Sequence, residues 1–127
     1  MDGKKIPESC TCYHVRKRLE TVNKYLAGYN QHQPLTQTDP TATTIAMTSC
    51  LWGINRPWTY NYPGFYTLDP DIQAGITIHE NEHRQQCINM GQKRYMELQK
   101  EKEYVLEVPA YTKERDFLEG KLTEKCK

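Results

Sequence analysis

Apolar residues recur at helical spacing in two long stretches of the chain. In the first stretch, residues 12–27, they fall at alternating steps of four and three residues, at Val15, Leu19, Val22 and Leu26. This spacing predicts an amphipathic helix with one buried face. Gly28 follows the last apolar residue and is a typical residue at the end of a helix.

The second stretch begins at Asp69-Pro70, a capping carboxylate followed by a proline suited to the first helical position. Its apolar residues are Ile72, Ile76 and Ile78. The pattern predicts a helix to about Met90, ended by Gly91.

Two further helical stretches follow, from Gln92 to about Leu106 and from Val108 to about Lys121. Pro109 either starts the second of them or kinks one long helix, because proline lacks a backbone N–H.

The region between the first two long helices is less regular. Residues 29–42 predict a loop. Thr43–Trp52 predicts a strand, and Phe65–Leu68 a second short strand that pairs with it. Residues 53–64 predict a loop, because Gly53, Pro57 and Pro63-Gly64 lie close together. Its Trp58, Tyr60 and Tyr62 either bind substrate or cover a small core. The predicted fold class is α+β and mainly helical, with a short β-hairpin or small sheet.

A chain of 127 residues supports one compact domain, residues 1–127, with residues 1–11 as a tail. The formal net charge is only +1, and the basic residues are dispersed. In the first predicted helix, Arg16, Lys17, Arg18 and Lys24 are assigned to a solvated face rather than to a nucleic-acid contact. We therefore expect neither a nucleic-acid partner nor a membrane partner.

Five cysteines allow two disulfides and one free thiol, and the sequence leaves the pairing open. Disulfides would place the protein in an oxidising compartment, whereas five reduced thiols would suit the cytoplasm. No signal-peptide pattern follows Met1. We expect a secreted or periplasmic protein that is released from a longer chain or delivered by dedicated machinery, with a cytoplasmic protein as the alternative.

The run His79-Glu80-Asn81-Glu82-His83 lies within the second predicted long helix. Residues four apart lie about 40° apart around a helix and roughly 6 Å along it, so His79 and His83 can bind one metal ion. Glu80 lies beside such an ion, where a carboxylate can act as general base on a water. We therefore predict one catalytic Zn²⁺ ion. Glu82 either orients a ligand or is exposed.

Two histidines leave a third ligand to be found elsewhere. His14 and His32 lack a patterned context, and Cys87 lies too far along the same helix to share the ion. A helix that returns against the motif could instead supply Glu103 or Glu107. Glu107 is favoured, because Ala110 allows close helix approach and Tyr111 lies on the same side.

The motif at 79–83, followed by Glu107-x-x-Ala110-Tyr111, resembles the gluzincin branch of the zinc metallopeptidases. Within that branch it is similar to the compact zincin domains of bacterial polymorphic toxins and secreted effectors. The resemblance implies that His79, His83 and Glu107 bind zinc and that Glu80 is the base. It also implies that Tyr111, or one of Tyr60, Tyr62 and Tyr66, assists the tetrahedral intermediate. Pro109 departs from a regular helix, and the third histidine of the metzincins is absent.

These observations predict a zinc metallopeptidase that hydrolyses amide bonds in a protein or peptide substrate. A cognate inhibitor or immunity protein is a partner that the toxin resemblance implies. An amidase acting on cell-wall peptides would need the same zinc and base. The alternative without catalysis is a disulfide-stabilised binding or toxin module whose histidines are incidental.

Overall fold

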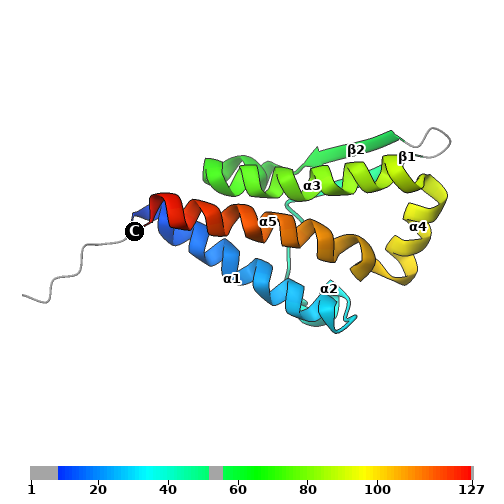
Figure 1. Cartoon of the computed structure of the whole chain (residues 1–127), viewed down its shortest axis with the longest axis horizontal. Coiled ribbons are helices and arrows are strands. Elements are labelled where there is room, and N and C mark those ends of the chain that lie inside the picture. The colour runs from blue at the N-terminus through cyan, green and yellow to red at the C-terminus, as the bar shows by residue number, and fades with distance from the viewer. Residues whose placement is uncertain (1–8, 52–55, 127) are drawn as a thin grey trace, which may run out of the picture.

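Three long helices lie side by side and form most of the protein (Figure 1). The computed structural model describes residues 9–51 and 56–126. The helices are α1 (Cys10–Asn30), α3 (Pro70–Met90) and α5 (Glu103–Lys125). Helix α5 packs against both α1 and α3 and runs in the opposite direction to both (Figure 1). With one small antiparallel sheet, the fold class is α+β and mainly helical, as predicted.

Helix α1 confirms the apolar stripe but is longer than predicted at both ends. The hydroxyl of Ser9 caps it by accepting a hydrogen bond from the N–H of Cys12 at 3.1 Å. Residues 10 and 11 of the predicted tail therefore belong to the helix, and residues 1–8 lie outside the described residues.

Gly28 does not end α1, as the sequence had suggested. It lies inside the helix and faces α2 (Leu35–Thr38), a short helix within the predicted loop. A Cβ atom at Gly28 would lie 2.1 Å from Oγ1 of Thr38. The glycine is therefore needed for close approach of the two helices rather than for termination.

Helix α3 has the predicted bounds, but the Asp69 carboxylate does not cap it and pairs with His14 instead. Asp69 is the N-cap residue, Pro70 is the first helical residue, and Gly91 ends the helix with a φ of 84°. Ile72 and Ile76 are buried, so the apolar stripe faces the protein interior as expected.

The predicted boundary between the last two helices was wrong. Helix α4 (Gln92–Glu101) ends earlier, and the break falls at Lys102, whose φ of −143° is not helical. The chain turns there because Leu98 and Leu106, on either side of the break, are both buried in one small cluster. Pro109 neither starts a helix nor marks the break, since it lies inside α5. It costs that helix a backbone hydrogen bond.

The sheet is an antiparallel pair of β1 (Ala46–Leu51) and β2 (Arg56–Asn61), in which Thr48 lies opposite Thr59. Strand β1 confirms the first predicted strand over a shorter range, and Trp52 lies outside the described residues. Phe65–Leu68 is not a strand, because residues Pro63–Thr67 form the 3₁₀ helix η1. The pairing strand is β2, from the stretch interpreted as an aromatic loop. Its Pro57 is tolerated because each strand of a two-stranded sheet has a free edge.

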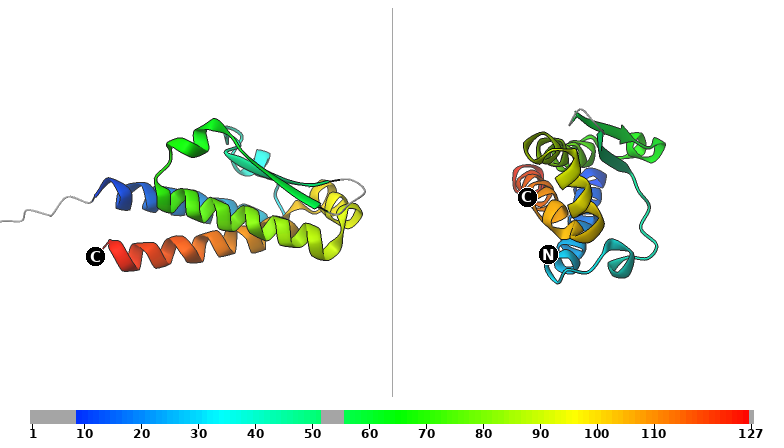
Figure 2. Two further views of the ribbon diagram at one scale, coloured as in Figure 1. Left: turned by 90° about the horizontal axis from the view of Figure 1, so that it is seen from above. Right: turned by 90° about the vertical axis from the view of Figure 1, so that its right-hand side faces the viewer.

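The hairpin lies against α3 (Figure 2). A disulfide between Cys50 and Cys87 joins β1 to this helix. Arg84 of α3 also donates a hydrogen bond to the hydroxyl of Thr59, at 3.2 Å. These links place β1 next to the part of α3 that carries the histidines.

The core combines aliphatic and tyrosine side chains, as the tyrosine-rich composition suggested. Tyr25, Tyr29 and Tyr111 are buried within its main cluster. A second disulfide joins Cys12, near the start of α1, to Cys126, just after α5. Cys10 is free and exposed, so the expected two disulfides and one free thiol are confirmed.

Candidate metal centre

Helix α3 directs both motif histidines into the protein interior. His79 and His83 are 5% and 7% exposed. Their Nε2 atoms lie 3.2 Å apart, as the spacing of one helical turn allows. The pair therefore forms one face of an enclosed site rather than two separate surface residues.

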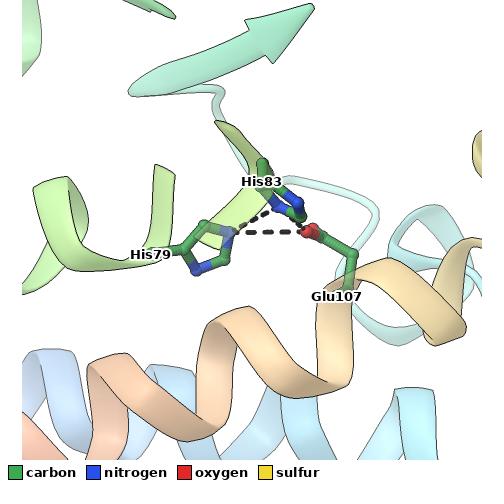
Figure 3. Close-up of side chains that lie close together, drawn as sticks. All are labelled: His79, His83 and Glu107. Atoms are coloured by element: carbon green, nitrogen blue, oxygen red, sulfur yellow. Dashed lines mark hydrogen bonds and ion pairs between the residues drawn. The ribbon is translucent and has the colours of Figure 1, made fainter. Parts of the chain in front are cut away.

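Helix α5 brings Glu107 to the same point. Its Oε1 atom lies 3.4 Å from Nε2 of His79 and forms an ion pair with Nε2 of His83. The three side chains point toward one another in Figure 3. Their possible ligand atoms all lie within 4.8 Å of one another, so His79, His83 and Glu107 could hold a metal ion. The structure thus brings together the three residues that the sequence singled out as ligands.

Both histidines are oriented by partners on their other ring nitrogen. Nδ1 of His79 lies 3.1 Å from Oε1 of Glu114, a fully buried residue of α5. Nδ1 of His83 lies 2.9 Å from Oε1 of Gln86, whose amide nitrogen donates to the carbonyl of Leu106. Because both partners are acceptors, each Nδ1 carries a proton, which leaves each Nε2 as the nitrogen that a metal ion would bind.

The carboxylate behind His79 is itself held by a cation. Arg18 of α1 donates from Nε to Oε2 of Glu114 at 2.7 Å and from Nη2 to Oε1 at 3.2 Å. Such a two-point contact fixes the carboxylate in orientation as well as in charge. Although burial opposes ionisation, contacts with His79 and Arg18 lower the pKa of Glu114. A chain of contacts from α1 through α5 to α3 therefore orients His79.

The charges of the centre fit a cation. Oε1 of Glu107 is buried, and apart from its ion pairs with the two histidines it has no hydrogen-bond partner within the described residues. Burial disfavours charge on His79, but Glu107 and Glu114 outweigh it and raise its pKa to about 10. Burial likewise opposes the charge on Glu107, yet the two histidines lower its pKa. The pocket thus favours positive charge where the two Nε2 atoms and Oε1 meet.

Glu80 lies beside the cluster and not within it. Its Oε2 is 3.8 Å from Nε2 of His79, and its Oε1 accepts a hydrogen bond from the hydroxyl of Thr48 at 2.8 Å. Thr48 belongs to β1, so the hairpin fixes the orientation of this carboxylate. Glu80 is only 6% exposed and keeps one oxygen free to face the centre.

A cleft of about 520 Å³ opens onto the cluster. His79, Glu80, His83 and Glu107 line it together with residues 42–48, which include the first part of β1. Tyr111 also lines it, with its ring edge-on to that of His79 at 4.2 Å between centroids. On the side of His83 the cleft is lined by Tyr95 of α4, whose ring is edge-on to that histidine.

The other candidates for a third ligand lie elsewhere. His14 forms an ion pair with Asp69, and His32 stacks on Tyr104. Glu103 lies one turn before Glu107 but accepts a hydrogen bond from the hydroxyl of Tyr29. Cys87 is in a disulfide, as its position suggested.

Three tyrosines offered as alternatives to Tyr111 do not line the cleft. Tyr60 and Tyr66 are 47% and 66% exposed, and Tyr62 directs its hydroxyl to the sulfur of Met47. Glu82 is half-buried and accepts hydrogen bonds from Gln86 and Lys113. It therefore acts on His83 only through Gln86.

Sequence reasoning missed the residues that support the ligands. Glu114 follows Glu107 by two helical turns, and Gln86 follows His83 by one, so helical periodicity could have indicated both. Arg18 was assigned to a solvated helix face, and nothing in its neighbourhood along the chain distinguishes it. Thr48 and Tyr95 become apparent only once the hairpin and α4 have been placed.

The disulfides indicate an oxidising environment, because such bonds rarely persist in a reducing cytoplasm. Over residues 9–51 and 56–126, no helix has both the length and the apolar character required to span a bilayer. No family model, curated protein or solved structure matches the chain significantly. Its function is therefore inferred from its own residues.

Proposed function

We propose that the protein is a zinc-dependent peptidase that hydrolyses amide bonds, with Glu80 as general base. The observation that carries this proposal is the convergence of three lone-pair atoms on one buried point. Nε2 of His79, Nε2 of His83 and Oε1 of Glu107 meet there, and the Glu80 carboxylate lies next to them.

Zinc suits this set of donors. Two imidazole nitrogens and one carboxylate oxygen are the ligands of a common catalytic zinc site, which leaves a fourth position for water or substrate. Donor atoms about 2.0–2.1 Å from a tetrahedral ion lie about 3.3 Å from one another. The separations of 3.2 and 3.4 Å from Nε2 of His79 agree with that value, whereas Nε2 of His83 and Oε1 of Glu107 lie closer together and would have to move apart to bind one ion. When bound, zinc lowers the pKa of a water and polarises the substrate carbonyl.

The chain itself supplies the proton transfer. Thr48 holds one oxygen of Glu80, so the other can accept the proton of the attacking water. The same carboxyl then delivers this proton to the leaving amine. Tyr111 lines the cleft beside His79 and is the residue proposed to contact the substrate carbonyl oxygen.

The cleft favours an extended peptide as substrate. Its wall includes Ala46, Met47 and Thr48 of β1, whose only strand partner among the described residues is β2. A peptide could add to the free edge of β1 through main-chain hydrogen bonds, which would place an amide bond next to Glu80.

The disulfides suit a secreted or periplasmic protein, and the motif resemblance suits a toxin or effector domain. A cognate inhibitor that covers the cleft would be the corresponding partner. Both statements are part of the proposal.

The substitution Glu80→Gln tests the proposal, with Glu97→Gln on the exposed face of α4 as the matched control. Zinc-loaded wild type and E97Q are expected to cleave peptides of a denatured proteome digest, measured by mass spectrometry of new termini. E80Q should retain zinc and cleave at least about 100-fold more slowly. Cleavage by E80Q at the wild-type rate, or no cleavage by the zinc-loaded wild type, would contradict the proposal. Cleavage only of peptidoglycan stem peptides would instead indicate the amidase.

A further inference from the structure

A second hollow adjoins the cleft of the metal centre. It measures about 400 Å³ and lies between α1, the end of η1 and the start of α3. Arg18, Thr21 and Ile45 line both spaces. A substrate that occupies the cleft can therefore extend past these residues into the second hollow.

The two carboxylates at or behind this hollow each have a partner. His14 pairs with Asp69 at 2.6 Å, and both side chains line the hollow. Arg18 pairs with the buried carboxylate of Glu114. Each carboxylate is thus already engaged by a donor of the protein, and of the two only Asp69 lines the hollow itself.

Lys17 adds a cation to the lining. Among the described residues its ion-pair partner is Glu20 at 3.4 Å, which does not line the hollow. Both side chains are more than half exposed, at 54% and 60%, so their mutual attraction is weak. The ammonium group also lies 5.5 Å from the centroid of the Tyr13 ring, and an anion that enters the hollow would compete with these two exposed contacts.

Arg18 offers a second donor. Two of its nitrogens, Nε and Nη2, are used by Glu114, while Nη1 has no hydrogen-bond partner among the described residues. Its side chain is only 16% exposed, and the contact with Glu114 fixes the guanidinium plane. A guanidinium held in this way presents its remaining N–H groups in a set direction.

The rest of the lining is apolar or neutral. Ile45, Leu68 and Ile72 form an aliphatic surface, and Thr21 and Thr67 add hydroxyl groups. This combination suits a side chain with a short aliphatic stem and a terminal carboxylate.

We propose that this hollow is a specificity subsite that accepts an acidic side chain of the peptide substrate, bound by Lys17 and Nη1 of Arg18. The subsite rests on the proposed peptidase function and names its substrate class. Glutamate fits the aliphatic lining better than aspartate because its stem is one methylene longer.

Peptides that the zinc-loaded wild type cleaves provide the test. Each is resynthesised with Glu, Gln or Lys in turn at the three positions on either side of the cleaved bond. At one of these positions we expect Glu to raise kcat/KM over Gln by about 5- to 20-fold, with Lys lower than both. The preference should weaken at high salt, because exposed Lys17 is screened.

Lys17→Glu should reverse this preference toward Lys, while Lys93→Glu, at an exposed lysine of α4 outside both spaces, should leave it unchanged. Lys17→Met, which should abolish the preference, serves if the charge reversal prevents folding. Fluorescence anisotropy with zinc-loaded E80Q measures binding of the same peptides without cleavage, and the Glu peptide should again bind more tightly.

Equal cleavage of the Glu, Gln and Lys peptides at every position would overturn the subsite while leaving the peptidase proposal intact. An unchanged preference in both Lys17 variants would do the same. A zinc-loaded wild type that cleaves no peptide would overturn both proposals.

Discussion

The contact between α3 and α5 has an apolar half and a polar half. In the apolar half, Ile72, Gly75 and Ile76 of α3 face the Leu118 side of α5, and a Cβ on Gly75 would lie 3.2 Å from the Leu118 side chain. In the polar half, His79 and His83 face Glu107 and Glu114. One half is stabilised by removing apolar surface from water, the other by charges that require partners.

Along this one pair of helices, the apolar contact is therefore expected to stabilise the fold and the polar contact to bind a metal ion. The apolar half contributes to folding whether or not a metal is bound. The polar half buries groups that are costly to bury unpaired, and a bound cation pairs them. Substitutions in the polar half should therefore mainly lower metal affinity, whereas substitutions in the apolar half should mainly lower the free energy of unfolding.

The largest expected effect is in the polar half. Glu107→Ala removes a ligand and should lower zinc affinity on the order of 1000-fold, measured by competition with a chromogenic chelator. Glu103→Ala, one turn earlier on the same helix, is the matched control and should change affinity by less than about 10-fold. The opposite ranking would assign the third ligand to Glu103.

The next effect is in the apolar half. Leu118→Ala leaves a cavity beside Gly75 and should lower the free energy of unfolding by about 2–5 kcal/mol, measured by urea denaturation. Its zinc affinity should stay within a factor of about three of the wild type, because Leu118 contacts no ligand. A loss of zinc affinity comparable to that of Glu107→Ala would show that the two halves are not separable.

Smaller losses of zinc affinity are expected from substituting Glu114 and Gln86, the partners of Nδ1 of the two histidines. Glu114→Gln and Gln86→Ala should each weaken zinc binding by about 10- to 100-fold. Glu114→Gln should have the larger effect, because the amide leaves the guanidinium of Arg18 without its counter-charge. Competition with a chelator measures the zinc affinity of both variants. Wild-type affinity in both would show that Glu114 and Gln86 do not support the zinc ligands.

The smallest expected effect is that the stability of the metal-free protein depends on pH. The folded pKa of His79 is raised to about 10, so its stabilising contribution is complete below the unfolded value of about 6.5 and is lost as pH rises toward 10. The Tm of chelator-treated protein should fall by several degrees from pH 6.5 to 9.5.

Bound zinc should abolish this fall in Tm with rising pH, because the ion takes the place of the protons on the histidine nitrogens. Leu118→Ala should show the wild-type slope from a lower Tm, because no titrating group changes. Glu107→Gln should flatten the slope. A slope that Glu107→Gln leaves unchanged would assign the pH dependence to other groups.

The sequence predicted the parts of the fold that depend on local pattern. The stripe of Val15 to Leu26 and the Asp69-Pro70 start each correspond to an observed helix, because periodicity and the fixed φ of a first-turn proline act within a few residues. The second strand was assigned to the wrong segment. Pro57 and the neighbouring glycines suggested a loop, whereas pairing with β1 stabilises a strand there.

The residues of the candidate metal site were likewise predictable where local spacing determines their position. The spacing of His79 and His83 follows from helix geometry, and the small Ala110 pointed to Glu107 rather than Glu103. Arg18 and Thr48 could not be found in this way, because their contacts join segments far apart in the chain. The misplaced helix boundary did not displace Glu107, since α5 extends from before it to well after it.

The measurement that tests the central claim most directly is the zinc content of the purified protein, determined by plasma mass spectrometry after dialysis. For wild type we predict roughly one tightly bound equivalent, and for a variant with His79, His83 and Glu107 all replaced by Ala, none. Less than about a tenth of an equivalent in the wild type, with no uptake on titration with zinc, would contradict a catalytic zinc site in this protein.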